Sequence, residues 1–427
     1  MKSSIVVPAT VLLSLSLVSA LNIHGHREAS VFAVSAQTAD PQALAGFKNE
    51  GLSQDQPNPC TPPDTITNSI EETAWRLFVA STCPVNESVY PYMTWENWIE
   101  QAQMYPLNPA KVLQIPASLA PSSSVSQHVL HSSALALARN PGIETTIPGL
   151  LGGADQNCNA AQAPPDNQKN LIICEEVRLN GSTQDYITGT TMWNRTGQKQ
   201  IAAAHEDIQF PKPSIEIKAD WIKLSSINFD CANLPPALSQ SVHIEMVNGN
   251  CYAMVGIHVI SKLLGQWIWA TFEPQNLTTN PFRCKVLGCS DSFGSRPARS
   301  RGTFTALTPQ LERLMNAARL APEWKNYRLD AVQTRFVDSD GKPTLSGNSI
   351  IEGENVGMNL KESSCISCHA LSSIKNDGTD GITLLTPSNN PLGEPEPLPS
   401  RDWIRRDFVW SLLEACPPGS PTQKCTQ

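Results

Sequence analysis

A C-x-x-C-H motif near the C-terminal end places the strongest chemical constraint on this chain. The motif is Cys365-Ile366-Ser367-Cys368-His369. Two thiols one helical turn apart can each form a thioether bond with a vinyl group of one haem, and the adjacent histidine can then bind the iron. A bare C-x-x-C would leave redox-dithiol or zinc sites open, but the histidine favours haem. We therefore expect one covalent haem c on Cys365 and Cys368, with His369 as the proximal iron ligand.

The other cysteines predict a disulfide-bonded, exported protein. The chain has 12 cysteines, so ten remain when the two of the motif are set aside. Connectivity does not follow from sequence alone, but the spacing favours near neighbours. The hypothesis is five bonds: Cys60–Cys83, Cys158–Cys174, Cys231–Cys251, Cys284–Cys289 and Cys416–Cys425. Disulfides and covalent haem both need an oxidising compartment, which indicates the periplasm or another exported location.

The N-terminus has the pattern of a secretory signal peptide over residues 1–20. Lys2 supplies a positive charge, Ile5 to Val18 an apolar core, and Val18-Ser19-Ala20 a small-residue cleavage site. Cleavage after Ala36 is the alternative, and an uncleaved membrane anchor is another. No later stretch approaches 18 consecutive apolar residues, so we expect no transmembrane span in the mature chain.

Composition and charge favour a folded protein that does not bind nucleic acid. Hydrophobic residues make up 40% of the 427 residues and charged residues only 16%, which is typical of folded rather than disordered chains. The net charge is −8 and there is no basic block. Such a chain is repelled by nucleic acid and by anionic membrane surfaces.

Patterning along the chain predicts an α+β protein with three regions after the signal peptide. Residues 21–165 are expected to be helical and loop-rich, 166–300 to form a β-rich domain, and 301–427 to form a cytochrome c-like haem domain. The β-rich region is expected to be an antiparallel sheet with one buried face. Its strands are predicted at 171–177, 214–224, 242–246, 251–262 and 266–272, and a further strand at 327–337.

Helices are expected at both ends of the chain. One is predicted over residues 65–80, capped by Thr67 or Asn68, and others over 92–104 and from Thr308-Pro309 to Leu320. In the haem domain, a helix over 355–364 should lead into the motif. Another, over 400–415, is indicated by Ile404, Phe408 and Leu412 at helical spacing. The carbonyl of Pro387 is the expected acceptor for the second ring nitrogen of His369.

The sixth iron ligand is the least determined part of the site. Neither methionine nor histidine follows His369, although common small cytochromes c place a methionine ligand there. Three options stay open: Met358 before the motif, a histidine such as His258 from the predicted sheet, or an open sixth position. Lys361 and Lys375 are weaker candidates.

Several segments resemble a group of exported bacterial cytochrome c family proteins. The resemblance extends over roughly residues 65 to 415. It is carried by 215–221, 256–259, 267–273, 284–289 with Asp291 and Phe293-Gly294, 326–329, and 363–365 leading into the haem motif. The resemblance implies one covalent haem and an exported location, without a settled substrate. The link between Asn348 and the haem cysteines is longer here than is usual in the group, so the resemblance does not assign a sixth ligand.

Three functions are compatible with these features. The first is a periplasmic electron carrier that meets a redox partner protein through a small, transient interface. The second is an oxidoreductase in which the upstream region binds a small-molecule substrate, and the third is a haem-based ligand sensor or binding protein. The sequence contains no Ser-His-Asp order, nucleotide-binding loop or metal-ligand cluster upstream, so whether the protein is an enzyme stays open. Electron transfer is the first prediction.

Overall fold

The computed structural model describes residues 58–85, 93–105, 158–160, 170–247, 249–275, 283–289, 291–295, 306–385 and 391–416. They belong to one compact unit that begins at Pro57. The predicted signal peptide and both cleavage sites lie outside the described residues. The division at 165 and 300 does not separate compact units, because one sheet includes strands from all three predicted regions.

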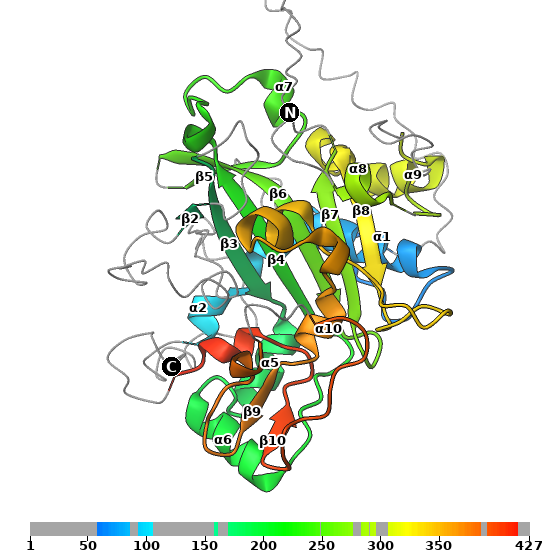
Figure 1. Cartoon of the computed structure of the whole chain (residues 1–427). Helices are drawn as coiled ribbons and strands as arrows, with labels where there is room; N and C mark the ends of the chain where they lie inside the picture. Colours follow the sequence, from blue (N-terminus) through cyan, green and yellow to red (C-terminus); the bar gives the residue numbers. More distant parts are fainter. Residues whose placement is uncertain are drawn as a thin grey trace, which may run out of the picture. The chain divides into compact units, whose positions relative to one another are not determined.

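An antiparallel sheet of eight strands forms the centre of this unit (Figure 1). The strand order is β1-β3-β4-β6-β7-β8, with β2 paired to β3 and β5 paired to β6. The strands are β1 (Ile99–Glu100), β2 (Asn159–Ala160), β3 (Ile172–Leu179), β4 (Ile215–Lys223), β5 (Ile244–Val247), β6 (Asn250–Ser261), β7 (Ile268–Pro274) and β8 (Tyr327–Gln333). A second, two-stranded sheet pairs β9 (Ser373–Lys375) with β10 (Trp403–Arg405).

The predicted strands are confirmed, with shifts of a few residues at their ends. The hairpin between β5 and β6 is tight, because Val247 pairs with Asn250 and Gly249 has φ +80°. Glycine adopts this left-handed conformation without the steric cost that a Cβ atom brings. Gly265 lies in the next turn, after which Ile268 pairs back to Ser261.

Helices of the described chain are short, and two of the predicted ones are confirmed. α1 (Ile70–Thr82) begins after Ser69, whose side chain accepts a hydrogen bond from the Glu72 amide, so the cap is neither Thr67 nor Asn68. α9 (Pro309–Ala317) begins as predicted, with Thr308 as its cap. The other α-helices are α2 (Gln101–Met104), α5 (Gly181–Gly189), α6 (Arg195–Ala204), α7 (Pro236–Ser239), α8 (Arg283–Leu287) and α10 (Cys365–His369).

Short 3₁₀ and π segments connect these elements. The 3₁₀ segments are η2 (Thr94–Asn97), η3 (Leu224–Ile227), η4 (Pro322–Asn326), η6 (Leu360–Glu362), η7 (Gly381–Leu384) and η8 (Ser411–Glu414). One segment, η5 (Ser349–Asn355), is π-helical. Such segments leave the regular hydrogen-bond pattern and are frequent at functional sites.

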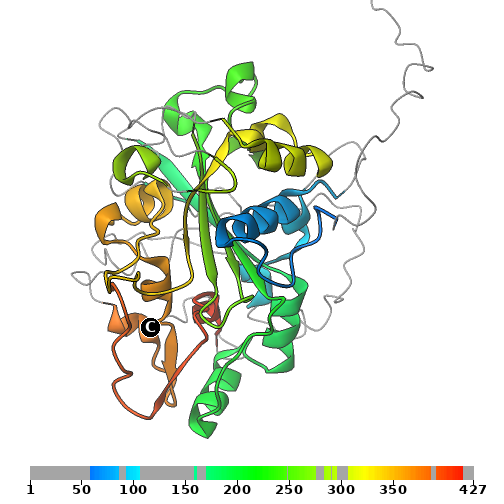
Figure 2. The ribbon, with the colours of Figure 1, turned by 90° about the vertical axis from the view of Figure 1, so that its right-hand side faces the viewer.

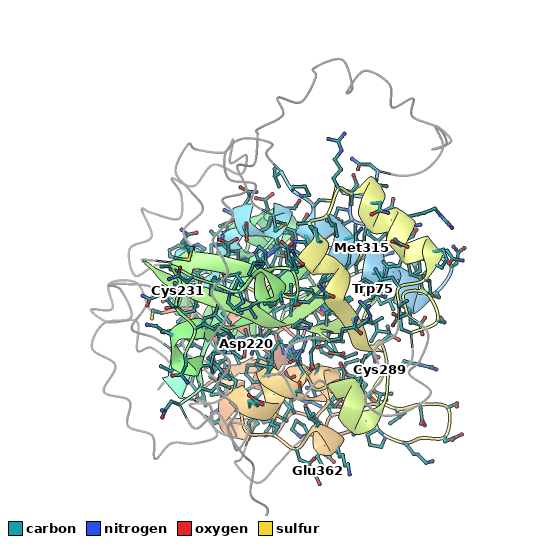
Figure 3. All side chains as sticks on the ribbon, turned by 90° about the horizontal axis from the view of Figure 1, so that it is seen from above. Trp75, Asp220, Cys231, Cys289, Met315 and Glu362 are labelled. Carbon is teal, nitrogen blue, oxygen red and sulfur yellow. A yellow bond between two sulfur atoms is a disulfide. The ribbon has the colours of Figure 1, made fainter. Side chains whose placement is uncertain are left out.

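Both faces of the large sheet are covered, whereas the sequence predicted one buried face. Figure 2 shows α1 (blue) on one face and the segment containing η5 and α10 (orange) on the other. Figure 3 gives the same order from above, with Trp75 and Met315 on the α1 side and Glu362 at the far side beyond Asp220. The core on the α1 side includes Trp75, Phe78 and Phe272. A second core joins α10 to the ends of β6 and β7 through Cys365, Ile366, Ile260 and Trp269.

The predicted helical haem domain is wrong in its secondary structure. Residues 355–364 form the end of η5 and then η6, separated by Gly357 at φ +75°. Residues 400–415 form β10 and η8, because Asp407 and Phe408 both have positive φ angles, which no α-helix contains. The helical spacing of Ile404 and Leu412 reflects burial in the second core.

Four of the five predicted disulfides are confirmed. They join Cys60 to Cys83, Cys158 to Cys174, Cys231 to Cys251, and Cys284 to Cys289. Cys416 is also disulfide-bonded, and its expected partner Cys425 lies outside the described residues.

Within the described part of the chain, every helix is too short or too polar to cross a lipid bilayer.

Candidate functional site

The C-x-x-C-H motif forms α10, and Gln333 at the end of β8 fixes where this helix begins. The Gln333 Oε1 atom accepts a hydrogen bond from the Ile366 amide at 3.2 Å, and its Nε2 atom donates to the Ser364 hydroxyl at 3.0 Å. Ser364 is the N-cap residue of α10, but its side chain makes no capping hydrogen bond to the helix. A strand residue therefore satisfies an amide that the start of a helix leaves without an intrahelical partner.

The imidazole of His369 is held by a main-chain carbonyl. Its Nδ1 atom lies 2.8 Å from the Phe408 carbonyl oxygen, and its ring packs on Trp269 with 4.4 Å between ring centroids. Burial lowers the pKa of His369 to about 3, so the ring is neutral. Nδ1 then carries the proton that it donates to Phe408, which leaves the Nε2 lone pair for a ligand. Pro387 was predicted in this role and lies outside the described residues.

The two cysteines of α10 differ from all other described cysteines. Cys365 and Cys368 are buried and are not disulfide-bonded, whereas every other described cysteine is. The Cys365 thiol donates to the Ser346 carbonyl at 3.2 Å. Burial raises the pKa of Cys365 well above its usual value, so the thiol is protonated rather than a metal-binding thiolate. This donor set, two buried cysteines one helical turn apart and an oriented neutral imidazole, fits a covalently attached haem.

The surroundings of His369 are close-packed on one side and open near Ala370 on the other. Between the imidazole and the sheet residues Glu216, Ile260 and Trp269 there is no room for a water molecule. A cavity of about 710 Å³ is lined by Ala370, which follows His369 in the chain, and by Phe408. This volume lies in the range of cofactor sites, roughly 300–1,000 Å³. Phe408 lines this cavity and also lies beside the His369 imidazole.

The sheet face toward Cys365 carries buried polar groups. His258 on β6 lies 3.0 Å from Glu352 of η5, measured from Nε2 to Oε1. A ring nitrogen of His258, the Cys365 sulfur and a Glu352 oxygen all lie within 4.8 Å of one another. In the strand register Lys218 on β4 lies opposite His258, and its Nζ atom is 2.7 Å from Glu175. The pairing of Lys218 with Glu175 offsets the cost of burying their charges on this face.

Burial shifts the pKa values of the carboxyl groups on this face. Burial, helped by Glu175, raises the pKa of Asp220 to about 8. Burial also raises the pKa of Glu216 to about 7 and that of Glu354 to about 8. Glu352 differs, because His258 and Lys218 outweigh the effect of burial and hold its pKa below the usual value. This region therefore combines carboxyl groups whose pKa values are raised with one, Glu352, whose pKa is lowered.

The candidate sixth ligands lie in different surroundings. His258 is brought next to the motif, since its ring nitrogen lies close to the Cys365 sulfur. Met358 packs with Val356 in a cluster separate from the core that contains Cys365. Lys361 is exposed to solvent. Lys375 forms an ion pair with Asp377 at the protein surface.

Sequence reasoning did not find Gln333, Glu352, Trp269 or the Phe408 carbonyl. Each reaches the motif through tertiary contacts, and none has a local pattern that marks such a role. The π-helical segment that contains Glu352 precedes the helix predicted over 355–364, and no predicted element includes Glu352. The family resemblance at 267–273 includes Trp269 but implies no role for it.

No protein-family model, curated protein or solved structure matches this chain.

Proposed function

We propose that this protein is an exported c-type cytochrome that carries one haem, bound covalently through Cys365 and Cys368, and that transfers electrons. The observation that carries the proposal is the state of the motif. Among the cysteines that the structure describes, Cys365 and Cys368 are the two that form no disulfide bond. His369 donates a hydrogen bond from Nδ1 to the Phe408 carbonyl. The four described disulfide pairs support an oxidising, exported compartment, where haem attachment also takes place. Membership of the cytochrome c family is part of this proposal.

Residues of this chain would bind and tune the haem. When bound, the haem supplies one-electron chemistry. His369 would be the proximal ligand, and the hydrogen bond from its Nδ1 to the Phe408 carbonyl keeps the ring orientation and the tautomer. Trp269 packs on the imidazole and restricts its rotation. A redox partner protein would meet the haem edge through a small, transient interface.

A second candidate function is a haem-dependent oxidoreductase or a small-ligand-binding protein with an open sixth iron position. The observation that favours it is the buried pair of His258 and Glu352 next to Cys365. An electron carrier needs no such groups, whereas a catalyst can use them to accept and return protons. Asp220, with its pKa of about 8, extends the set of proton-holding groups on this face.

Haem attachment is tested by removing the two thiols. Cys365→Ala with Cys368→Ala should abolish the haem-stained band of the denatured protein on a gel, because no thioether can form. The matched control is Cys284→Ala with Cys289→Ala, which removes two thiols elsewhere and should keep the band. Covalent haem in the first variant would refute the site.

Carbon monoxide distinguishes the two candidate functions. If His258 closes the sixth position, the ferrous protein should show a low-spin spectrum and bind carbon monoxide slowly, and His258→Ala should make binding rapid. Met358→Leu is the matched control and should leave the spectrum unchanged. Rapid binding in the unaltered protein would reject the carrier in favour of the second candidate.

A further inference from the structure

Another buried histidine, His243, lies among three carboxylates. His243 directly precedes β5, and its side chain is only 7% exposed. Its Nε2 atom lies 3.1 Å from Glu245 Oε1 on β5 and 3.7 Å from Glu96 Oε1 on η2. Its Nδ1 atom lies 3.8 Å from Glu323 Oε1 on η4. Three elements that are distant in sequence therefore direct oxygen atoms at one imidazole.

The geometry of this cluster is not that of a simple hydrogen bond. The His243 Nε2 atom is buried, and although a Glu245 oxygen lies 3.1 Å away, the angle between the two groups is not that of a well-formed hydrogen bond.

The distances agree with a tetrahedral cation. Zinc binds histidine nitrogen and carboxylate oxygen at about 2.1 Å, which places tetrahedral ligand atoms roughly 3.4 Å apart. The two distances from Nε2, 3.1 Å and 3.7 Å, lie on either side of that value. The ligand atoms of Glu96, His243 and Glu245 all lie within 4.8 Å of one another.

The surroundings hold the donors in place. The His243 ring stacks on Trp324 with 4.7 Å between centroids, and the His243 main-chain amide donates a hydrogen bond to the Tyr327 hydroxyl at 3.3 Å. The Met93 amide donates to Glu96 Oε2 at 2.7 Å, which leaves Oε1 directed at His243. Glu323 lies on the Nδ1 side, where metal-binding histidines commonly meet a carboxylate.

We propose that Glu96, His243 and Glu245 bind one divalent cation of the zinc class, with water as a fourth ligand. Water can reach the site because the Glu245 side chain is 29% exposed. The cation would join η2 to β5. It would neutralise the negative charges of Glu96 and Glu245, which a single imidazole cannot do. The competing arrangement is a protonated His243 paired with the carboxylates, which binds no zinc. This site is independent of the haem proposal.

The test measures zinc binding to the full-length mature protein after chelator treatment. Isothermal titration with zinc sulfate should give one site per chain, elemental analysis should find about one zinc atom per chain, and zinc should raise the unfolding temperature. Because Trp324 stacks on His243, its fluorescence should also change on titration. A folded protein that takes up no zinc would overturn the proposal.

Variants decide which residues bind the ion. His243→Gln and Glu245→Gln should each weaken zinc binding at least tenfold, whereas Glu312→Gln, an exposed carboxylate on α9, should not change it. Glu245 is partly exposed, so its variant should fold even if that of His243 does not. Cys365→Ala with Cys368→Ala should bind zinc as before, because Cys365 belongs to the other possible cluster, with His258 and Glu352. Zinc binding that persists in Glu245→Gln, or that disappears with the cysteines, would place the ion elsewhere.

Discussion

The orientation of His369 depends on two residues in left-handed backbone conformations. Asp407 has φ 49° and Phe408 has φ 72°, and the Phe408 carbonyl accepts the imidazole proton. Asp407 is held by Lys262 at 2.6 Å and by the Phe210 amide at 2.8 Å. Left-handed conformations cost energy in residues other than glycine, so these buried contacts must stabilise them.

The neighbouring residue Arg406 gives a first prediction. Arg406 is fully buried, and its guanidinium lies 2.8 Å from Asp380, which also pairs with Arg195. Asp380→Asn leaves two buried guanidinium groups without their carboxylate, so we expect a loss of about 3–5 kcal/mol in the free energy of unfolding. Urea unfolding measures it. Asp377→Asn, which breaks the exposed pair with Lys375, should have no measurable effect, and equal losses in both variants would contradict this account.

The same ion pair gives the sign of the acid dependence. Burial alone would raise the pKa of Asp380, but Arg406 and Arg195 outweigh it and lower the pKa below 3.8. The stabilisation is therefore complete above about pH 4 and is lost as the pH falls through the lower folded-state pKa. The difference in unfolding free energy between the protein and Asp380→Asn should shrink over that acidic range.

Gly294 gives a prediction about packing. A Cβ atom at Gly294 would lie 2.0 Å from Trp75 Nε1, which itself donates to Asp291 at 2.7 Å. Gly294→Ala should destabilise the protein by at least about 1–3 kcal/mol, because a buried ring and its hydrogen bond must move. Gly265→Ala is the control, since nothing lies within 4 Å of its Cβ position. Equal melting temperatures in the two variants would contradict the close packing.

At the scale of elements, the alternating pattern of β4 predicts a strand but does not predict that both of its faces are buried. Its alternation of Ile215, Ile217 and Ala219 predicted one buried face, and these residues are buried. The opposite face, with Glu216 and Asp220, is buried as well, because η5 and α10 cover it. Polar residues at alternate positions of a strand usually indicate a solvent-exposed face, but in β4 they line a buried polar site.

Asp220 on β4 gives the prediction that belongs to this scale. Its pKa rises from 3.8 to about 8, mainly by burial, so the folded state binds a proton that the unfolded state has lost between these values. Stability should therefore fall as the pH rises from about 4 to 8, by up to about 1.4 kcal/mol per pH unit from this group. Asp220→Asn should remove this contribution, making the variant relatively more stable at pH 8 than at pH 5. Parallel stability curves for the two proteins would refute the shift.

The two helices that were predicted on either side of the motif failed for a local reason. Helical spacing of apolar residues reports which residues are buried, and burial in an irregular segment can produce the same spacing. No α-helix can continue through the left-handed conformations of Gly357, Asp407 and Phe408. The presence of Asp or Phe in a sequence does not by itself predict a left-handed conformation.

At the scale of the whole molecule, the disulfides constrain the unfolded chain. Loop-closure entropy predicts a loss of about 3 kcal/mol in unfolding free energy for Cys231→Ala with Cys251→Ala, whose cysteines are 20 residues apart. The pair Cys284 and Cys289 is only 5 residues apart, and its removal should cost about 2 kcal/mol. Urea unfolding of both double variants checks the order. A larger loss from the shorter loop would show that native contacts, not chain entropy, dominate.

The sequence by itself determined the features that depend on neighbours along the chain. These are the C-x-x-C-H motif in one helical turn, the near-neighbour disulfides, the strands that became β3 to β8, and the start of α9. Each follows from covalent spacing, alternation or capping over a few residues, so no distant contact is needed to recognise it.

Only the tertiary structure decided what surrounds the motif and where polar groups meet. Gln333 meets Ile366, Glu352 meets His258, and His243 meets Glu96, each across long stretches of chain. Such meetings depend on strand order and on how irregular segments cover the sheet, which no local pattern encodes. The proposed haem-attachment motif therefore consists of five consecutive residues, whereas the contacts around it depend on the folded sheet.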